Sequence, residues 1–259
     1  ARFFHKTLYT PEGEAALSYI QRRGITKGAV TRFGLGAAPD RWDALMTEMT
    51  SVGFDKQLLL DVGLLVNGKN GHIYDRFRNR LMFPIINVRG QVIGFGGRVL
   101  DDSLPKYLNS PESDIFNKGR NLFALNLSKK SKQGRIILTE GYMDALSLHQ
   151  AGFDCAVASL GTALTPEHAK LLSRYTKEVV IAYDCDTAGI AAANRAIPIL
   201  EQAGLTVKVL QLQGAKDPDE FIKQHGREAF SLLLDRSENH MEYQLMQIKM
   251  RYHLEEPEE

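Results

Sequence analysis

Residues 135 to 212 alternate between short apolar runs and segments with helical spacing. The apolar runs are RIILTE, CAVASLG, EVVIAYD and LTVKVLQL, at 135–140, 155–161, 178–184 and 205–212. The helical segments between them are 143–152, 165–175 and 187–204. Strands this rich in apolar residues are buried on both faces, and helices between them act as crossovers that join parallel strands. The pattern predicts an α/β fold, a mainly parallel sheet flanked by helices.

Acidic residues stand where these strands end. Glu140 closes the first strand, Asp184 closes the third with Asp186 two residues later, and Asp217 and Asp219 follow the fourth. In open α/β sheets the ligand site lies beyond the carboxyl ends of the strands. Residues i and i+2 of an extended segment lie roughly 7 Å apart on one face, where two carboxylates repel by about 2 kcal/mol at an effective dielectric near 20. The pattern predicts a site for Mg²⁺, with Mn²⁺ able to replace it.

Each acid also has an ordinary structural explanation. A single Asp after a strand is often a helix cap, and Asp186 stands directly before Thr187-Ala188-Gly189. Asp144, four residues after Glu140, could be a first-turn acid that favours the helix dipole, or could lie in the outer metal shell. The shared sheet edge of Glu140, the 184/186 pair and the 217/219 pair favours the metal site.

Two nucleotide-binding motifs are ruled out or fit poorly. A P-loop requires Gly-Lys-Ser/Thr after a glycine-rich loop, and the sequence contains none. The glycine-rich segments 33–39 and 94–98 fit a dinucleotide fingerprint poorly, because the second lies in a predicted hairpin at 81–100. Nicotinamide binding is therefore not expected.

The first half of the chain is strongly basic. Residues 1–135 contain 21 lysines and arginines against 12 acids, a net +9, and residues 136–259 contain 11 against 19, a net −8. Such asymmetry suits a protein that holds phosphates with one half and cations with the other, although chance segregation on two solvated surfaces gives the same sums. Arg76, Arg78 and Arg80 would share one face if their segment is a strand.

Two sets of motifs carry a family resemblance. LTEGYMDALSL (138–148), YDCDTAG (183–189) and the later DPDEF resemble the Toprim module of primases, topoisomerases and certain nucleases. The basic half resembles the RNA polymerase core of bacterial DnaG-type replicative primases in five segments. These are YIQRRGI (19–25), YDRFRNRLMFPI (74–85), GFGGRVL (94–100), PKYLNSPES (105–113) and FNKGRNLF (116–123). The resemblance extends from about residue 5 to 230.

The resemblance implies an enzyme that synthesises RNA primers on single-stranded DNA from ribonucleoside triphosphates by metal-assisted nucleotidyl transfer. It implies Glu140, Asp184 and Asp186 as catalytic residues, which with Asp219 and Asp217 hold metal, while Asp144 lies in the outer shell. Glu140 could ligate metal or transfer a proton. The expected nucleotide and nucleic-acid contacts are Arg23, Arg76, Arg78, Arg98, Lys106, Asn109, Lys118 and Arg120.

Three parts are expected: a basic α+β subdomain at 1–128, a Toprim metal-binding subdomain at 129–219 and a small helical segment at 220–259. Cys155 and Cys185 are expected to be buried and to bind no zinc. The zinc-binding and helicase-contacting domains of such primases do not fit in this chain, so we expect an excised catalytic core, monomeric and cytoplasmic at the bacterial replication fork, without membrane contact. Its partners would be template, ribonucleotides and RNA–DNA hybrid product.

Two other functions stay open. A Toprim nuclease or topoisomerase fragment would nick DNA in a metal-dependent reaction, whereas a primase joins ribonucleotides with pyrophosphate release. A non-catalytic nucleic-acid binding module would make the acid cluster incidental.

Overall fold

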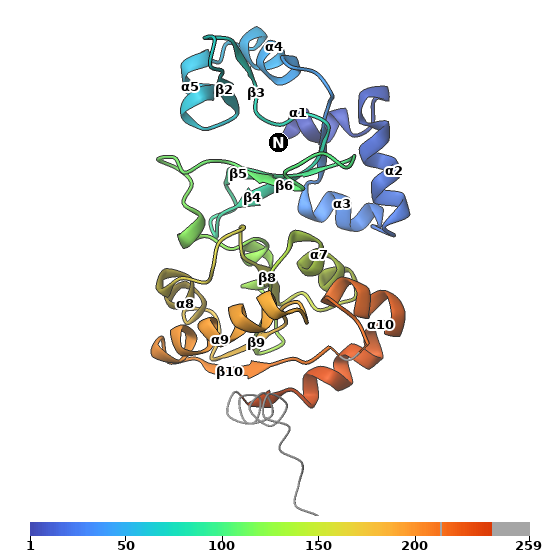
Figure 1. The fold of residues 1–259 in the computed structure, drawn as a ribbon, viewed down its shortest axis with the longest axis vertical. Coiled ribbons are helices and arrows are strands. Elements are labelled where there is room, and N and C mark those ends of the chain that lie inside the picture. The colour runs from blue at the N-terminus through green and yellow to red at the C-terminus, as the bar shows by residue number, and fades with distance from the viewer. Residues whose placement is uncertain (213, 240–259) are drawn as a thin grey trace, which may run out of the picture. The chain divides into compact units, whose positions relative to one another are not determined.

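The computed structural model describes residues 1–212 and 214–239, and it divides into two compact units, Ala1–Asn126 and Leu127–Glu259. Figure 1 shows the elements of both units. The predicted C-terminal segment at 220–259 is described only as far as residue 239, so its remainder lies outside the described residues. Within the described part, no helix is long and apolar enough to cross a membrane.

The first unit is built on a four-stranded antiparallel sheet of order β1-β4-β5-β6. The strands are β1 (Gly36–Ala38), β4 (Arg80–Ile86), β5 (Val92–Val99) and β6 (Tyr107–Asn109). The predicted hairpin is confirmed: β4 and β5 pair, and Asn87 and Gln91 close the turn, in which Gly90 has a φ of 87°. Glycine suits this turn because positive φ carries no steric cost for it.

Helices and a small ribbon surround this sheet. They are α1 (Arg2–Thr7), α2 (Glu14–Arg22), α3 (Lys27–Phe33), α4 (Ala44–Ser51), α5 (Lys56–Asp61), the paired strands β2 (Leu65–Asn67) and β3 (Ile73–Asp75), and the 3-10 turns η1 (Pro11–Gly13) and η2 (Lys118–Arg120). Phe4 of α1 packs edge-on against Phe77 and Phe95 in the core. The short helix α6 (Leu125–Ser128) follows at the boundary between the units.

The second unit contains the predicted parallel sheet. Its order is β11-β10-β9-β7-β8, and all neighbours are parallel except the edge strand β11 (Glu238–Asn239). The parallel strands are β7 (Arg135–Thr139), β8 (Ala156–Ala158), β9 (Glu178–Ile181) and β10 (Thr206–Val209). The central strands β7 and β9 are buried along nearly their whole length, as crossover helices on both faces require.

Four helices complete this unit: α7 (Tyr142–Gln150), α8 (Pro166–Leu172), α9 (Thr187–Gln202) and α10 (Pro218–Asp235). In Figure 1, α7 and α10 lie together, as do α8 and α9. Thr165 caps α8, because its hydroxyl accepts from His168 N and Pro166 occupies the first turn. The α/β prediction is confirmed, with β9 ending three residues earlier than predicted.

Candidate metal and nucleic-acid sites

The carboxylates at the carboxyl edge of the parallel sheet act on one another electrostatically. The pKa of Asp184 is raised to about 6, mainly by burial and then by the neighbouring charges of Glu140, Asp217 and Asp186, while Lys216 acts in the opposite direction. Burial also raises the pKa of Glu140, with a smaller contribution from Asp186. The loops after β7, β9 and β10 therefore bring their acids together, as the strand register predicts.

Asp144 belongs to the same group. It lies in the first turn of α7 and is buried, and its Oδ1 accepts a hydrogen bond from Asp219 N at 3.4 Å. Its pKa is raised to about 7, mainly by burial and then by the charges of Asp217, Asp184 and Asp219. An ordinary first-turn acid is solvated, so the burial of Asp144 among acids favours a functional position.

Four other acids of this group each accept a hydrogen bond from a nearby backbone amide or lysine. Glu140 Oε1 accepts from Asp184 N at 3.2 Å, and Asp219 Oδ2 pairs with Lys223 Nζ at 2.7 Å. Asp186 Oδ1 accepts from Gly189 N, which makes Asp186 the cap of α9. Asp217 caps α10 in the same way, through Glu220 N. Asp186 is therefore a helix cap, as the structural explanation predicts. Only Oδ1 of its carboxylate makes the cap hydrogen bond.

The predicted acids do not form a compact group of metal ligands in the described residues. Within residues 1–212 and 214–239, no three His, Cys, Asp or Glu side chains lie close enough together to hold a metal ion. Asp184 and Asp186 would share one strand face only if the strand continued as far as residue 186, and it does not, because β9 ends at Ile181 and both acids lie in the loop that follows. The donors still suit Mg²⁺, which prefers one or two carboxylates and several waters.

Gly189 allows the close approach of this loop to Glu140. A Cβ at position 189 would lie 2.1 Å from Asp184 O and 3.0 Å from Glu140 Oε1. A Cβ at Gly141 would lie 2.8 Å from an oxygen of Asp144. Both positions therefore require glycine for space, where the sequence alone suggests only a turn.

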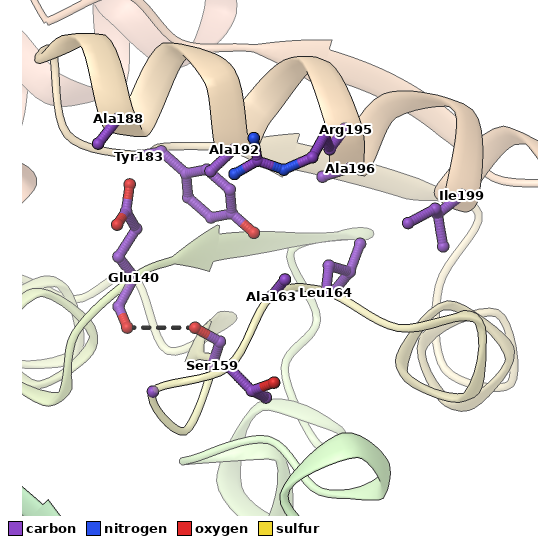
Figure 2. Close-up of a pocket in the computed structure, with 12 residues that line it drawn as sticks. Glu140, Ser159, Ala163, Leu164, Tyr183, Ala188, Ala192, Arg195, Ala196 and Ile199 are labelled. Atoms are coloured by element: carbon purple, nitrogen blue, oxygen red, sulfur yellow. Dashed lines mark hydrogen bonds between the residues drawn. The ribbon is translucent and has the colours of Figure 1, made fainter.

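A cavity of about 430 Å³ adjoins Glu140. Its walls are the segment after β8, from Ser159 to Leu164, and the face of α9 that carries Ala188, Ala192 and Arg195. Figure 2 shows the Tyr183 hydroxyl directed into the space between these walls, and the Ser159 hydroxyl hydrogen-bonds the Glu140 carbonyl. Neither Tyr183 nor Arg195 was predicted to be functional from the sequence.

Arg98 lies in β5, within a group of tyrosines and a second arginine. Its guanidinium carbon is 4.3 Å from the centroid of the Tyr19 ring and 5.9 Å from that of Tyr107. Arg23 Nε donates to the same Tyr19 hydroxyl at 2.8 Å. Arg98 Nε is buried and hydrogen-bonds none of the residues that the structure describes. Arg98 therefore lies in the second strand of the predicted hairpin, and Tyr19 brings it close to Arg23.

Arg76, Arg78 and Arg80 do not share a strand face. β3 ends at Asp75 and β4 begins at Arg80, with Asn79 at a φ of 47° between them. Arg76 donates to Asn109 O, and the buried Arg80 donates to Gly97 O and Pro105 O. The positive φ breaks the extended segment, so the expected common face is wrong.

Arg78 takes part in an exposed aromatic group. Its guanidinium carbon lies 3.9 Å from the Trp42 ring centroid and 5.1 Å from that of Tyr74, and it donates to Asp75 O. Trp42, the single tryptophan of the sequence, is 63% exposed. A stack of this kind offers a base a flat surface and a cation. We name it the Trp42 platform, and only the isolated tryptophan could have indicated it from sequence.

The remaining predicted contacts lie along β6 and η2. Lys106 is exposed beside β6, and its carbonyl accepts from Val99 N. Asn109 pairs with Gly96 across β5 and β6. Lys118 and Arg120 lie in η2, where the Lys118 amide donates to Glu112. Cys155 is buried as predicted, whereas Cys185 is exposed, because the loop that carries it lies beyond the end of β9.

Comparison with known proteins identifies the family. Residues 3–129 match the model of the DNA primase catalytic core, N-terminal domain, and residues 137–222 match a Toprim-like model. A solved structure described as the E. coli primase catalytic core is 39% identical, with a TM-score of 0.89, over 97% of this chain and 82% of that chain. The chain belongs to the DnaG primase family. Another solved DnaG catalytic domain, bound to single-stranded DNA, is 40% identical with a TM-score of 0.86, over 92% of this chain and 76% of that one.

This DnaG-family chain spans about two fifths of the length of its curated relatives. The DNA primase of Clostridium acetobutylicum is 50% identical over 95% of this chain and 41% of that protein. The DNA primase of Escherichia coli K12 is 42% identical over 91% of this chain and 41% of that protein. Primases with a Toprim domain depend on metal ions, which agrees with the group of carboxylates at the sheet edge.

Proposed function

We propose that this chain is the catalytic core of a bacterial primase, which synthesises short RNA primers on single-stranded DNA. One observation carries the proposal: six acids gather at the sheet edge, where burial together with neighbouring carboxylates raises the pKa of Asp184 to about 6 and that of Asp144 to about 7. Such a group calls for a divalent cation, as nucleotidyl transfer does. Family membership names the reaction class.

The reaction joins two ribonucleotides. The 3′-oxygen of the growing chain forms a bond to the α-phosphorus of a ribonucleoside triphosphate, and the bond from that phosphorus to the β-phosphate oxygen breaks. Pyrophosphate leaves with the bonding electrons, and the 3′-hydroxyl proton passes to solvent or to a carboxylate. Mg²⁺, or Mn²⁺ in its place, held by the carboxylates at the sheet edge, would supply positive charge that stabilises the attacking and leaving oxygens.

The six acids have two proposed roles: some would bind the cation, and others would position the residues that bind it. Asp184 and Glu140 are the first choice to hold the cation, with Asp186, Asp217 and Asp219 contributing their second oxygens or bound water. Glu140 also fixes the loop through Asp184 N, 3.2 Å away. Asp144 would position these ligands without binding the cation, because it is buried and accepts a hydrogen bond from Asp219 N. Glu140 is also the nearest candidate to accept the 3′-hydroxyl proton.

The basic half holds the nucleic acid. Arg23, Arg98, Lys106, Lys118 and Arg120 would contact phosphates of the template or the triphosphate, and the Trp42 platform would stack on a base. Arg76, Arg78 and Asn109 act mainly as supports, since Arg76 donates to the Asn109 carbonyl and Arg78 to the Asp75 carbonyl. The RNA–DNA hybrid, the zinc-binding domain and the replicative helicase complete the set of partners, in the bacterial cytoplasm at the replication fork.

The direct test is primer synthesis. Wild-type protein is incubated with a single-stranded template, labelled ribonucleotides and Mg²⁺, beside Asp184→Asn and the exposed-site control Asp102→Asn. We expect short RNA products and pyrophosphate from wild type and control, and at least a hundredfold less from Asp184→Asn. Absence of product even with a zinc-binding domain supplied in trans, or nicking of DNA instead, would contradict the proposal.

A further inference from the structure

The cavity beside Glu140 contains two opposite charges that do not pair. Glu140 and Arg195 both line it, but no ion pair joins them, and Arg195 makes no hydrogen bond or ion pair with any residue in the described ranges 1–212 and 214–239. Figure 2 shows Arg195 reaching back along α9 toward the end that carries Ala188, where the Glu140 carboxylate lies. Long helical side chains point in this direction, toward the helix N-terminus. The cavity is therefore anionic at one side and cationic at the other.

Tyr183 adds a hydrogen-bond donor to this cavity. Its side chain is only 7% exposed, and its hydroxyl forms no hydrogen bond within the part of the chain that the structure describes. The hydroxyl oxygen itself is not among the buried side-chain atoms that lack a hydrogen-bond partner in the described residues, so it is accessible to a ligand or water in the cavity. The hydroxyl is directed into the cavity, between α9 and the segment with Ala163 and Leu164.

One kind of ligand satisfies all three groups. A diphosphate with its divalent cation places the cation against Glu140 and its anionic oxygens against Arg195 and the Tyr183 hydroxyl. Arginine binds phosphate oxygens in its planar fork. Ala188, Ala192 and Ala196 leave the α9 wall open, and the volume of about 430 Å³ is ample for a diphosphate.

We infer that Arg195 and Tyr183 form a diphosphate subsite, which holds the β- and γ-phosphates of the incoming ribonucleoside triphosphate and then the pyrophosphate that leaves. This inference rests on the proposed function and deepens it. The subsite holds the same two phosphates before and during the attack on the α-phosphorus, so it contributes to nucleotide affinity more than to kcat. Because Arg195 is solvent-exposed, its contribution is modest and weakens with salt.

The test measures pyrophosphate binding directly. Mg²⁺-pyrophosphate is titrated by calorimetry into the full chain at low salt, for wild type, Arg195→Gln, Arg195→Lys and Tyr183→Phe. Arg174→Gln is the matched control, an exposed arginine of the same unit outside the cavity. We expect about three- to tenfold weaker binding for Arg195→Gln, an intermediate value for Arg195→Lys, a smaller loss for Tyr183→Phe and no change for Arg174→Gln.

Kinetics and oligonucleotide binding distinguish a subsite for nucleotide phosphates from a contact with the nucleic-acid backbone. In primer synthesis, Arg195→Gln should raise the KM for ATP and the inhibition constant of pyrophosphate together, with kcat changed less than about twofold. Its affinity for a single-stranded oligonucleotide, measured by anisotropy, should equal that of wild type. The inference is overturned if wild type binds no pyrophosphate, if Arg195→Gln binds it equally well, or if only oligonucleotide affinity falls.

Adenosine separates a phosphate subsite from a base pocket. Adenosine should not displace pyrophosphate from wild type, and a loss of adenosine binding in Arg195→Gln with unchanged pyrophosphate binding would also overturn the inference. If wild type makes no primers, the proposed function fails, but the pyrophosphate titration still decides the subsite. Thermal melts check that each variant is folded, and we expect no shift for Arg195→Gln because the side chain is exposed.

Discussion

Asp144→Asn should change the stability of the metal-free protein with a sign that depends on pH. Burial raises the pKa of Asp144 from 3.8 to about 7, so the folded protein holds this proton more tightly than the unfolded chain does. The folded state therefore loses stability as the pH rises from about 4 to above 7. Asparagine removes the charge and keeps an oxygen for Asp219 N, 3.4 Å away.

The magnitude follows from the pKa and from the new amide. A move from 3.8 to about 7 corresponds to roughly 4 kcal/mol of lost stability once the carboxyl is ionised. The buried NH₂ of asparagine costs about 1–3 kcal/mol if it finds no acceptor. At pH 8 the variant should thus be more stable than wild type by about 2 kcal/mol, roughly 4–8 °C in Tm. Near pH 4 it should be slightly less stable.

Thermal melts in EDTA at pH 4.5 and pH 8 measure this difference. Asp102→Asn, an exposed acid in the other unit, serves as the control and should show no crossover. Mg²⁺ should reduce the stability difference between the two proteins at pH 8, because a bound cation offsets the repulsion on the ionised Asp144 of wild type, a repulsion that the asparagine variant lacks. Equal differences at both pH values, or a variant that is less stable at pH 8, would refute the electrostatic argument. Activity should fall even as stability rises.

Three further predictions concern other parts of the chain. Gly189→Ala should reduce primer synthesis at least tenfold and lower the free energy of unfolding by about 1–3 kcal/mol, because its Cβ would lie 2.1 Å from Asp184 O. The control Gly28→Ala, whose Cβ would lie 3.9 Å from the nearest atom, should be neutral. Similar activities of the two variants would contradict this prediction. Lys106→Ala should weaken DNA binding and reduce the salt slope by about 0.7, and an unchanged slope would reject a phosphate contact. Single-stranded DNA should quench the fluorescence of Trp42 and bind Trp42→Ala about fivefold or more weakly, so unchanged emission at saturation would exclude stacking.

The parallel sheet could be predicted because its cause is local. Apolar runs of strand length alternate with helical segments, and only one layer arrangement buries both faces of such strands. The position of the acids follows from the same alternation, since parallel strands end at one edge. The edge strand β11, two residues long at Glu238–Asn239, lacks any such pattern and was missed.

The partners of the basic residues could not be predicted in the same way. An arginine pattern says nothing of whether the guanidinium meets a phosphate or a nearby carbonyl. Arg80 is buried and donates to Gly97 O and Pro105 O, whereas Arg98 keeps a buried Nε that bonds no described residue. Only Arg98 of these two therefore suits a phosphate.

Several of the acids combine a structural hydrogen bond with a proposed role as cation ligand, and mutations at these positions change both. Asp186 and Asp217 cap α9 and α10, and Glu140 holds Asp184 N. Alanine at these positions removes a cap worth about 1 kcal/mol as well as a cation ligand, so lost activity alone does not show metal binding. Asparagine at Asp186 keeps the cap oxygen and removes the charge. If Asp186→Asn and Asp186→Ala lose Mg²⁺ affinity equally while only the alanine variant loses stability, the two uses are separate.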